Sequence, residues 1–366
     1  MRGARRTTAS ARVPAARARI RGIGWRFWQF SEGRPPAPVT VERMVALALA
    51  FSISALVLAI LARHPGIAPH DRANERSLHE GVVPRAGGWA VLGAWAVAAL
   101  VAGPPPGMSD SSFGAVLLAI AGLFAISLVD DYRGVGAAWR LAVHVACAIL
   151  VATMLSRDAG GGLAWIAATS FVLVAATNCY NFMDGSDGLA GAMAVSGFAS
   201  LAAGAALAGA PHATLLALAL AALPFLARNL PPARIFLGDA GSAPLGFLAG
   251  AAGVAGAAAG TWPAWFPVLV FLPFLADASV TLAKRALAGE RVWEAHRSHY
   301  YQRLVRAGFG HRGTLAVYGA LMVGCGATAV ACAAWRAEAG PLALAAWVAI
   351  VALVFGGIDY HWRQRG

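Results

Sequence analysis

Residues 44–62 read MVALALAFSISALVLAILA, a run that contains no charged side chain. A helix needs about 20 apolar residues to cross the hydrocarbon core of a bilayer, so this run predicts a membrane span. It is long for a signal peptide, and the Arg63-His64-Pro65 that follows it shows no small-residue cleavage pattern. We therefore interpret it as a span rather than as a leader.

Similar runs repeat along the rest of the chain. The chain is 59% hydrophobic and only 13% charged, whereas soluble proteins have about 25% charged residues. The connections between the runs are short, so no soluble domain is inserted. We predict an all-α, polytopic integral membrane helical bundle of about eleven transmembrane helices. The predicted spans lie near residues 44–62, 86–103, 113–129, 139–155, 163–177, 190–209, 212–227, 243–259, 262–282, 314–334 and 340–358.

The formal net charge of +12 does not indicate a nucleic-acid partner, because the basic residues are unevenly placed. The first 43 residues hold ten arginines and carry +8, which leaves +4 for the remainder. We interpret residues 1–43 as a basic extension outside the working part of the protein, and residues 44–366 as the membrane-embedded domain. Translation starting at Met44 would explain the extension, and an amphipathic surface helix is the alternative.

Basic residues mark the cytoplasmic side of a membrane protein. One set of alternate loops holds most of the lysines and arginines, whereas the other holds only Arg157 and Arg336. The basic set is therefore predicted to be cytoplasmic. Most of the carboxylates fall on this same side, although the rule does not concern them, and this predicts one polar site at the cytoplasmic mouth of the bundle.

Two adjacent carboxylates, Asp130 and Asp131, end one of the apolar runs. Like charges at a helix C-terminus repel each other and also face the negative end of the helix dipole. The pair is costly unless a cation or a proton offsets it. It is therefore a candidate functional feature, with a solvated helix end as the alternative.

The segment TNCYNFMDGSDGL, residues 177–189, forms a second polar cluster. Its amide and acid side chains recur every three residues, at Asn178, Asn181, Asp184 and Asp187. A helix that continued to Asp184 would project them to one side, and Gly185 and Gly188 would let the backbone turn close to a ligand. The spacing does not fit a calcium loop. A polar turn between spans is the alternative.

The segment RIFLGDAGS, residues 234–242, is a glycine-rich turn with one carboxylate, Asp239. We expect it to open a helix at about Ala243 and to present backbone N–H groups to an anion. It lacks the Gly-Lys-Ser/Thr of a Walker A loop, so ATP hydrolysis is not predicted. A plain helix-start turn is the alternative.

The longest inner loop contains ERVWEAHRSHYYQRL, residues 290–304. Arginine and histidine side chains suit a diphosphate, although such a patch can also bind anionic lipid headgroups.

Asp277 lies inside the ninth predicted span. An ionisable residue at that depth is a functional candidate, with a structural partnership to Thr281 or Lys284 as the alternative.

Taken in order, these motifs resemble the polyprenyl-phosphate N-acetylhexosamine-1-phosphate transferases of glycosyltransferase family 4, over almost the whole chain after residue 43. The motifs are Asn-x-Arg-Ser-x-His at 74–79, Pro-Arg-x-Gly-Gly at 84–88, Asp-Asp at 130–131, Asn-x-x-Asn-x-x-Asp-Gly-x-Asp-Gly-Leu at 178–189, Phe-x-Gly-Asp-x-Gly-Ser at 236–242, and the His-containing loop. The resemblance implies transfer of a sugar-1-phosphate from a UDP-sugar to undecaprenyl or another polyprenyl phosphate, with release of UMP. It also implies a bacterial inner-membrane location and a Mg²⁺ cofactor, or Mn²⁺ in its place.

The resemblance also implies roles for individual residues. Asp239 would bind the metal, and Asp130 and Asp131 would lie near the lipid phosphate, with one accepting its proton. Catalytic roles would fall to Asp130, Asp131, Asp184 and His299. Substrate binding would fall to Asn74, Arg76, His79, Asn178, Asn181, Asp187, Phe236, His296 and Arg297. By the same resemblance, Asn181, Asp184 and Asp187 would contact the nucleotide, with Asp187 near the uracil and Phe236 stacked on that base. The diphosphate or sugar would be bound by His296, Arg297 and His299.

One departure from the family pattern bears on the pathway. Many members carry His-x-His-His in the last inner loop, whereas here His299 is followed by Tyr300, Tyr301 and Gln302. This form resembles members that start O-antigen or capsule-type glycans, and it argues against the peptidoglycan phospho-N-acetylmuramoyl-pentapeptide transferase. The sequence leaves open which residue replaces the missing histidines.

A membrane transporter is the alternative from another functional class, but the charged residues gather at one face of the bundle rather than at mid-membrane.

Overall fold

The computed structural model describes residues 40–72, 82–292, 294 and 296–364, and these residues are mostly helical. The main helices are α1 (Val41–Arg63), α2 (Gly87–Ala102), α3 (Asp110–Arg133), α4 (Ala137–Ala159), α5 (Leu163–Phe182), α6 (Leu189–Leu207), α7 (Ala213–Asn229), α8 (Asp239–Ala258), α9 (Trp265–Val270), α10 (Leu272–Leu287), α11 (Tyr300–Leu304), α12 (Gly310–Trp335) and α13 (Gly340–Arg363). Short helical turns are η1 (Pro65–Ile67), η2 (Val305–Phe309) and η3 (Ala337–Ala339), and β1 (His70–Arg72) pairs antiparallel with β2 (Val82–Pro84).

Some sequence-based predictions lie outside the described residues. They concern nearly all of the basic extension, residues 1–39, and the loop that carries Asn74, Arg76 and His79. The first described residue is Thr40, whose side chain accepts a hydrogen bond from Arg43 N and caps α1.

The prediction of a polytopic membrane helical bundle is confirmed. Eight helical segments of the described chain are long and apolar enough to cross a membrane, and α2 and α7 are shorter apolar helices. The ninth predicted span is not one continuous helix, because it divides at Phe271 into α9 and α10. Pro273 has no backbone N–H and so cannot continue the hydrogen-bond ladder across this point. The number of helices that cross a bilayer stays a prediction.

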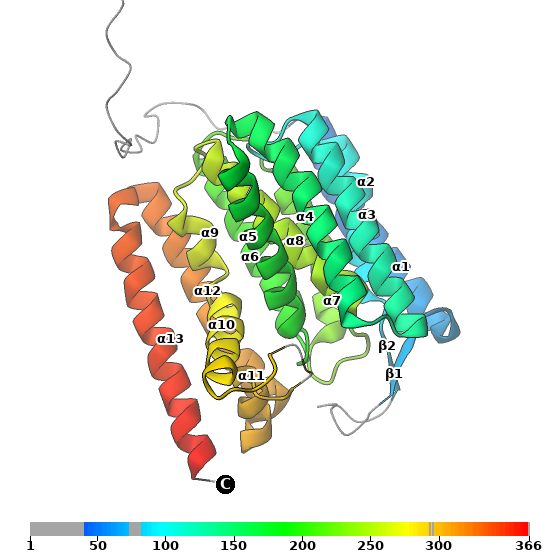
Figure 1. The fold of residues 1–366 in the computed structure, drawn as a ribbon. Coiled ribbons are helices and arrows are strands. Elements are labelled where there is room, and N and C mark those ends of the chain that lie inside the picture. Colours follow the sequence, from blue (N-terminus) through cyan, green and yellow to red (C-terminus); the bar gives the residue numbers. More distant parts are fainter. Residues whose placement is uncertain (1–39, 73–81, 293, 295, 365–366) are drawn as a thin grey trace, which may run out of the picture.

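The long helices pack side by side with α8 at the centre of the bundle and α13 at its edge (Figure 1). Small residues let α8 approach its neighbours closely. A Cβ atom on Gly246, for example, would overlap the carbonyl oxygen of Ala176 in α5. Close backbone contact through glycine and alanine is a common way to pack helices in a bilayer. The central position of α8 matters because its first residue is Asp239.

Consecutive long helices run in opposite directions, so alternate connections meet at one end of the bundle. Figure 1 shows β1, β2, α11 and the C-terminus at this end. Four helix ends also lie there: the end of α3, the start of α4, the end of α5 and the start of α8. Side-chain hydrogen bonds link them, from Arg140 to Asp130 and Asp239 and from Ser242 to Asn181. The predicted gathering of the polar motifs at one mouth of the bundle is thus seen in the fold.

Candidate active site

Two motifs that are far apart in the sequence pair through their backbones. The hydrogen bonds run from Phe236 N to Pro84 O at 2.8 Å, from Gly87 N to Phe236 O at 2.9 Å, and from Gly88 N to Leu237 O at 2.9 Å. A Cβ atom on Gly88 would overlap the backbone of Gly241, so only glycine lets the starts of α2 and α8 come this close. This pairing places the side chain of Arg85 beside Asp239.

Two arginines link the carboxylates that end α3 to the carboxylate that begins α8. Arg140 Nη1 lies 2.7 Å from Asp130 Oδ2 and 3.0 Å from Asp239 Oδ2. Arg85 lies 3.8 Å from Asp131 Oδ1 and 3.7 Å from Asp239 Oδ1. The cost of the adjacent acids is therefore offset by cations from other elements, in addition to the Val135 N–H that donates to Asp130 over 2.6 Å. Neither arginine was assigned a site role from the sequence, although Arg85 belongs to the Pro-Arg-x-Gly-Gly motif and the Asp-Asp pair indicated the need for a cation.

Asp184 lies in a turn and not on the helix. A helix that continued to Asp184 was the condition for one shared face, and this condition is not met because α5 ends at Phe182. Burial raises the pKa of the Asp184 carboxyl well above its ordinary value, and the nearby carboxylates of Asp239 and Asp131 add to this, whereas Arg85 opposes it. Asp184 thus belongs to the same cluster of negative charge.

The two asparagines of this motif remain on α5. Asn181 Oδ1 accepts a hydrogen bond from the hydroxyl of Ser242, in the first turns of α8. Asn178 Nδ2 donates to Val174 O at 2.8 Å, one helical turn back, and is half-buried. Asn181 therefore joins the cluster around Asp239, while Asn178 lies further into the bundle.

Asp187 turns away from this cluster. Its Oδ2 accepts from Ala233 N at 2.9 Å, and its Oδ1 lies 3.6 Å from His311 Nδ1 at the start of α12. The left-handed backbone of Gly188, with φ of 77°, directs the chain away after α5. The motif therefore does not present one continuous face. His311 was not identified as a site residue from the sequence. In the sequence His311 follows the longest loop and belongs to none of the motifs, so no neighbouring residue marks it as functional.

Helix α8 begins at Asp239, four residues before the expected start at about Ala243. Gly238, immediately before the helix, has φ of +76°, a conformation that favours glycine. Asp239 therefore occupies the first turn, where the helix dipole stabilises a carboxylate. Phe236, two residues before Gly238, is half-buried and is anchored through its backbone to the Pro84–Gly87 segment.

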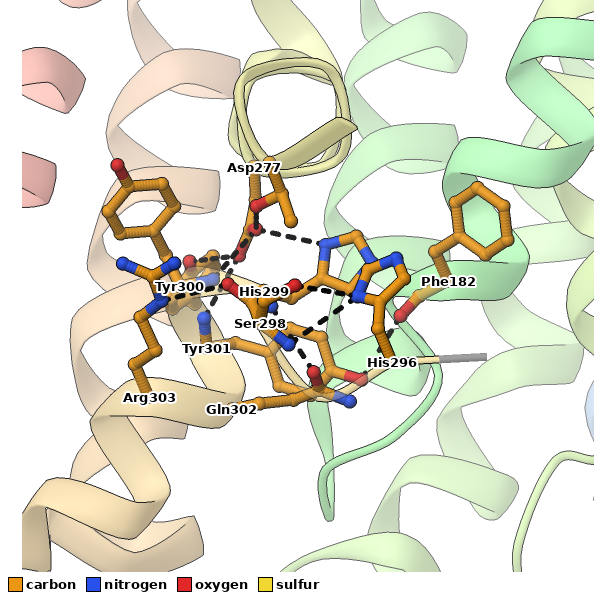
Figure 2. Close-up of polar contacts among 11 residues, drawn as sticks. Phe182, Asp277, His296, Ser298, His299, Tyr300, Tyr301, Gln302 and Arg303 are labelled. Atoms are coloured by element: carbon orange, nitrogen blue, oxygen red, sulfur yellow. Dashed lines mark hydrogen bonds and ion pairs between the residues drawn. The ribbon is translucent and has the colours of Figure 1, made fainter. Parts of the chain in front are cut away.

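The His-containing loop packs against the end of α5 (Figure 2). Tyr301 Oη donates to Phe182 O at 3.0 Å, and the ring centroids of Phe182 and His299 are 5.8 Å apart. The His296 and His299 rings lie next to each other with centroids 4.8 Å apart. Because Asp184 follows Phe182 by two residues, this loop borders the carboxylate cluster.

The two tyrosines that follow His299 anchor the loop. The Tyr300 ring stacks on Phe355 at 3.9 Å, and its hydroxyl contacts Lys284 and Asp359. Tyr301 reaches the carbonyl of Phe182, as described above. Neither takes the place of a second histidine at the site, and the imidazole next to His299 is instead that of His296.

Two groups of this loop have polar atoms without a hydrogen-bond partner in the described part of the chain. They are His299 Nε2, and Nε and Nη2 of the half-buried Arg297. Buried polar groups in folded proteins are usually satisfied. These buried donors and acceptors would be satisfied by an anionic ligand such as a diphosphate that reached the loop.

The carboxylate cluster suits Mg²⁺, although no three His, Cys, Asp or Glu side chains among the described residues are arranged to enclose a metal. Mg²⁺ keeps several waters and usually takes one or two carboxylates together with substrate phosphates. The raised pKa of Asp184 reflects burial beside an excess of negative charge that a divalent cation would relieve. Asp239 and Asp184 are the residues that would hold it.

Comparisons with known proteins place the chain in a family. The profile of glycosyl transferase family 4 matches residues 113–257. The chain is 28% identical to the Bacillus subtilis (strain 168) protein named "Probable undecaprenyl-phosphate N-acetylglucosaminyl 1-phosphate transferase", over 74% of this chain and 80% of that protein. It is 29% identical to the decaprenyl-phosphate N-acetylglucosaminephosphotransferase of Mycobacterium leprae (strain TN), over 77% of this chain and 80% of that protein. It is 30% identical to the phospho-N-acetylmuramoyl-pentapeptide-transferase of Thermosynechococcus vestitus (strain NIES-2133 / IAM M-273 / BP-1), over 63% of this chain and 67% of that protein.

The chain belongs to glycosyl transferase family 4. It is therefore a multi-pass membrane enzyme of the transferase class, and the transporter alternative is excluded.

Proposed function

We propose that this enzyme transfers an N-acetylhexosamine-1-phosphate from a UDP-sugar to undecaprenyl or another polyprenyl phosphate and releases UMP. The observation that carries the proposal is the convergence of acidic and basic side chains from separate helices at one end of a membrane bundle. These side chains are Asp130, Asp131, Asp184, Asp239, Arg85 and Arg140. The names of the relatives, which specify polyprenyl-phosphate acceptors and N-acetylglucosamine phosphate, support the same reaction.

The chemistry explains why such a site needs both signs of charge. An oxygen of the acceptor phosphate forms a bond to the β-phosphorus of the donor, and the bond from that phosphorus to the bridging oxygen breaks. The electron pair leaves with UMP. One diphosphate replaces another, so the main obstacle is the meeting of two anions. Mg²⁺ bound at Asp239 would neutralise that charge.

Individual residues then have distinct tasks. Arg85 and Arg140 lie between the carboxylates and can bind phosphate oxygens as these arrive. Asp130 or Asp131 takes the proton of the acceptor phosphate. Phe236 stacks on the uracil, and the His296–His299 loop binds the donor diphosphate or sugar. The lipid tail lies between helices of the bundle, and the reaction occurs at the cytoplasmic face of the bacterial inner membrane.

The names of the relatives specify two kinds of sugar donor, and these donors belong to different pathways. Relatives of both kinds match the chain, one named for N-acetylglucosamine and one for phospho-N-acetylmuramoyl-pentapeptide. The positions after His299 favour the first kind, because Tyr300 and Tyr301 pack against the bundle instead of adding imidazoles to the site. We propose that the enzyme starts a surface glycan of the O-antigen type, using N-acetylglucosamine or a 6-deoxy N-acetylhexosamine such as N-acetylfucosamine or N-acetylquinovosamine.

Radiolabel transfer separates these choices. Purified enzyme is incubated with undecaprenyl phosphate, Mg²⁺ and one labelled donor, and the lipid-linked product is extracted. We expect label from a UDP-N-acetylhexosamine in the lipid phase, with UMP in equal amount. Transfer from UDP-N-acetylmuramoyl-pentapeptide alone would show the peptidoglycan reaction instead, and no transfer from any UDP-sugar would refute the proposal.

A further inference from the structure

Asp277 is fully buried in α10, with an exposed fraction of 0%. An unpaired carboxylate in the interior of a bundle is strongly destabilising, so its oxygens need hydrogen-bond donors. Five groups contact them: Thr281 Oγ1 at 3.1 Å, His299 Nδ1 at 3.2 Å and Tyr300 N at 2.9 Å on Oδ1, and Tyr301 N at 3.0 Å and Tyr318 Oη at 2.5 Å on Oδ2. Asp277 thus joins α10, the His-containing loop and α12.

These contacts determine the protonation pattern of His299. An ionised carboxylate only accepts hydrogen bonds, and backbone N–H groups donate to both oxygens of Asp277. The Nδ1 atom of His299 must then carry the hydrogen that Asp277 accepts. The other ring nitrogen, Nε2, lies across the ring from Asp277 and either accepts a proton or, in the imidazolium, donates one.

The surroundings of His299 hold this orientation. The residue is 2% exposed, and its ring is flanked by His296 at 4.8 Å and Tyr301 at 5.9 Å. Figure 2 shows the His299 ring between Asp277 and His296. Its Nε2 atom is buried and has no hydrogen-bond partner among the described residues. A polar atom so tightly held and yet unsatisfied points to a ligand.

We propose that Asp277 is a positioning residue for the transfer reaction. It holds His299 in the Nδ1–H tautomer and in one orientation, and so directs Nε2 to a phosphate oxygen of the donor. This inference rests on the proposed function of the His-containing loop. It assigns Asp277 a task beyond its capping of α11, whose first two N–H groups donate to it. An aspartate that orients a histidine through Nδ1 is a general device at catalytic and metal sites.

A double-substitution cycle tests the proposal. The variants are Asp277→Asn, His299→Ala and the pair, with kcat and donor KM measured over pH by label transfer. The amide that replaces the carboxylate lacks one acceptor and cannot enforce the tautomer. We expect Asp277→Asn to lower kcat about 10–100-fold, the usual effect of removing the group that orients a histidine, with donor KM changed less. In the His299→Ala background the same substitution should cost less than about threefold, because groups that act as a unit are not additive.

Tyr318→Phe is the matched control, since it removes one donor from the same carboxylate without touching His299. It should lower the unfolding temperature in detergent but leave the pH profile of kcat unchanged. If Asp277→Asn and Tyr318→Phe reduced kcat equally, or if Asp277→Asn cost as much without His299 as with it, Asp277 would be only structural. If His299→Ala kept the wild-type rate, the failure would lie in the proposed function of the loop instead.

A spectroscopic measurement covers the case in which Asp277→Asn does not fold. ¹⁵N-histidine NMR of the wild-type enzyme in detergent reports the tautomer directly, and the His299→Ala spectrum assigns the signal. A proton on Nδ1 at neutral pH is expected. A neutral His299 with the proton only on Nε2 would overturn the proposal.

Discussion

Arg140, at the start of α4, donates a hydrogen bond of 3.0 Å to the carboxylate of Asp239, at the start of α8. The residues are separated by 99 positions in the sequence. The same guanidinium also binds Asp130, so one cation joins both acidic motifs of the site. The affinity for the proposed Mg²⁺ should therefore depend on this arginine, and this expectation underlies the first two predictions.

Asp239→Asn should remove most of the transfer activity, because the variant loses the carboxylate proposed to hold Mg²⁺. The expected loss is at least about 10²-fold, the scale on which charge stabilisation acts at catalytic sites. Label transfer as a function of Mg²⁺ or Mn²⁺ concentration measures it, with size-exclusion chromatography to show folded protein. Glu294→Gln is the control, since this exposed carboxylate pairs with Arg291 on the surface of the loop. Near-normal turnover by Asp239→Asn would rule out its assignment as the metal ligand.

Arg140→Ala should strengthen divalent-cation binding while it lowers turnover. Removing a positive charge beside two carboxylates raises the negative potential there. We expect Mn²⁺, followed by electron paramagnetic resonance, to bind about tenfold more tightly, which corresponds to about 1.4 kcal/mol. Arg133→Ala is the matched control, because this exposed arginine ends α3 without an ion pair in the described part of the chain. Unchanged or weaker Mn²⁺ binding in Arg140→Ala would place the cation elsewhere.

Asp130→Asn and Asp131→Asn should each reduce kcat. Both carboxylates lie among arginines at the site, and one is proposed to take the proton of the acceptor phosphate. The expected loss is about 10²–10⁴-fold for the residue that accepts the proton, as is typical of general bases. The other should show a smaller loss. Wild-type rates in both single variants would mean that the pair is structural.

Phe236→Ala should weaken the UDP-sugar more than the lipid acceptor. A phenyl ring stacked on uracil contributes to donor binding alone, and a loss of about 1–3 kcal/mol is typical of base stacking on an aromatic side chain. Donor KM and acceptor KM are measured separately. Phe309→Ala serves as the control because this ring is 47% exposed and lies near the start of α12. Equal effects on both substrates would assign Phe236 a packing role.

Asp187→Asn should lower stability as well as donor affinity. The buried carboxylate accepts a hydrogen bond from Ala233 N and lies near His311, so it ties the segment before Phe236 to α12. The amide of asparagine is a neutral and weaker acceptor than the carboxylate, and hydrogen bonds to charged groups contribute about 1.5–3 kcal/mol. Thermal unfolding in detergent, with and without UDP, measures both effects. An unchanged unfolding temperature would contradict the tethering role.

The helical bundle could be predicted from the amino-acid sequence, because membrane spans follow from local composition. Every predicted span coincides with a helix or, for residues 262–282, with the α9–α10 pair. A run such as residues 44–62 must satisfy its backbone hydrogen bonds internally in lipid, and a helix does this without reference to the rest of the chain. The acidic motifs were visible for a similar reason, since carboxylates beside apolar runs stand out in any context.

The way in which these motifs meet could be seen only in the folded protein. Arg140 looked like any other basic loop residue until folding placed it between Asp130 and Asp239. Asp277 stood out as a candidate, but its partners were equally hidden, because His299, Tyr300 and Tyr301 follow it by more than 20 positions. Charge pairing acts through space, and its strength depends on distance and on burial. Neither quantity exists until the helices have packed, so a linear pattern can name the charged groups but not their partners.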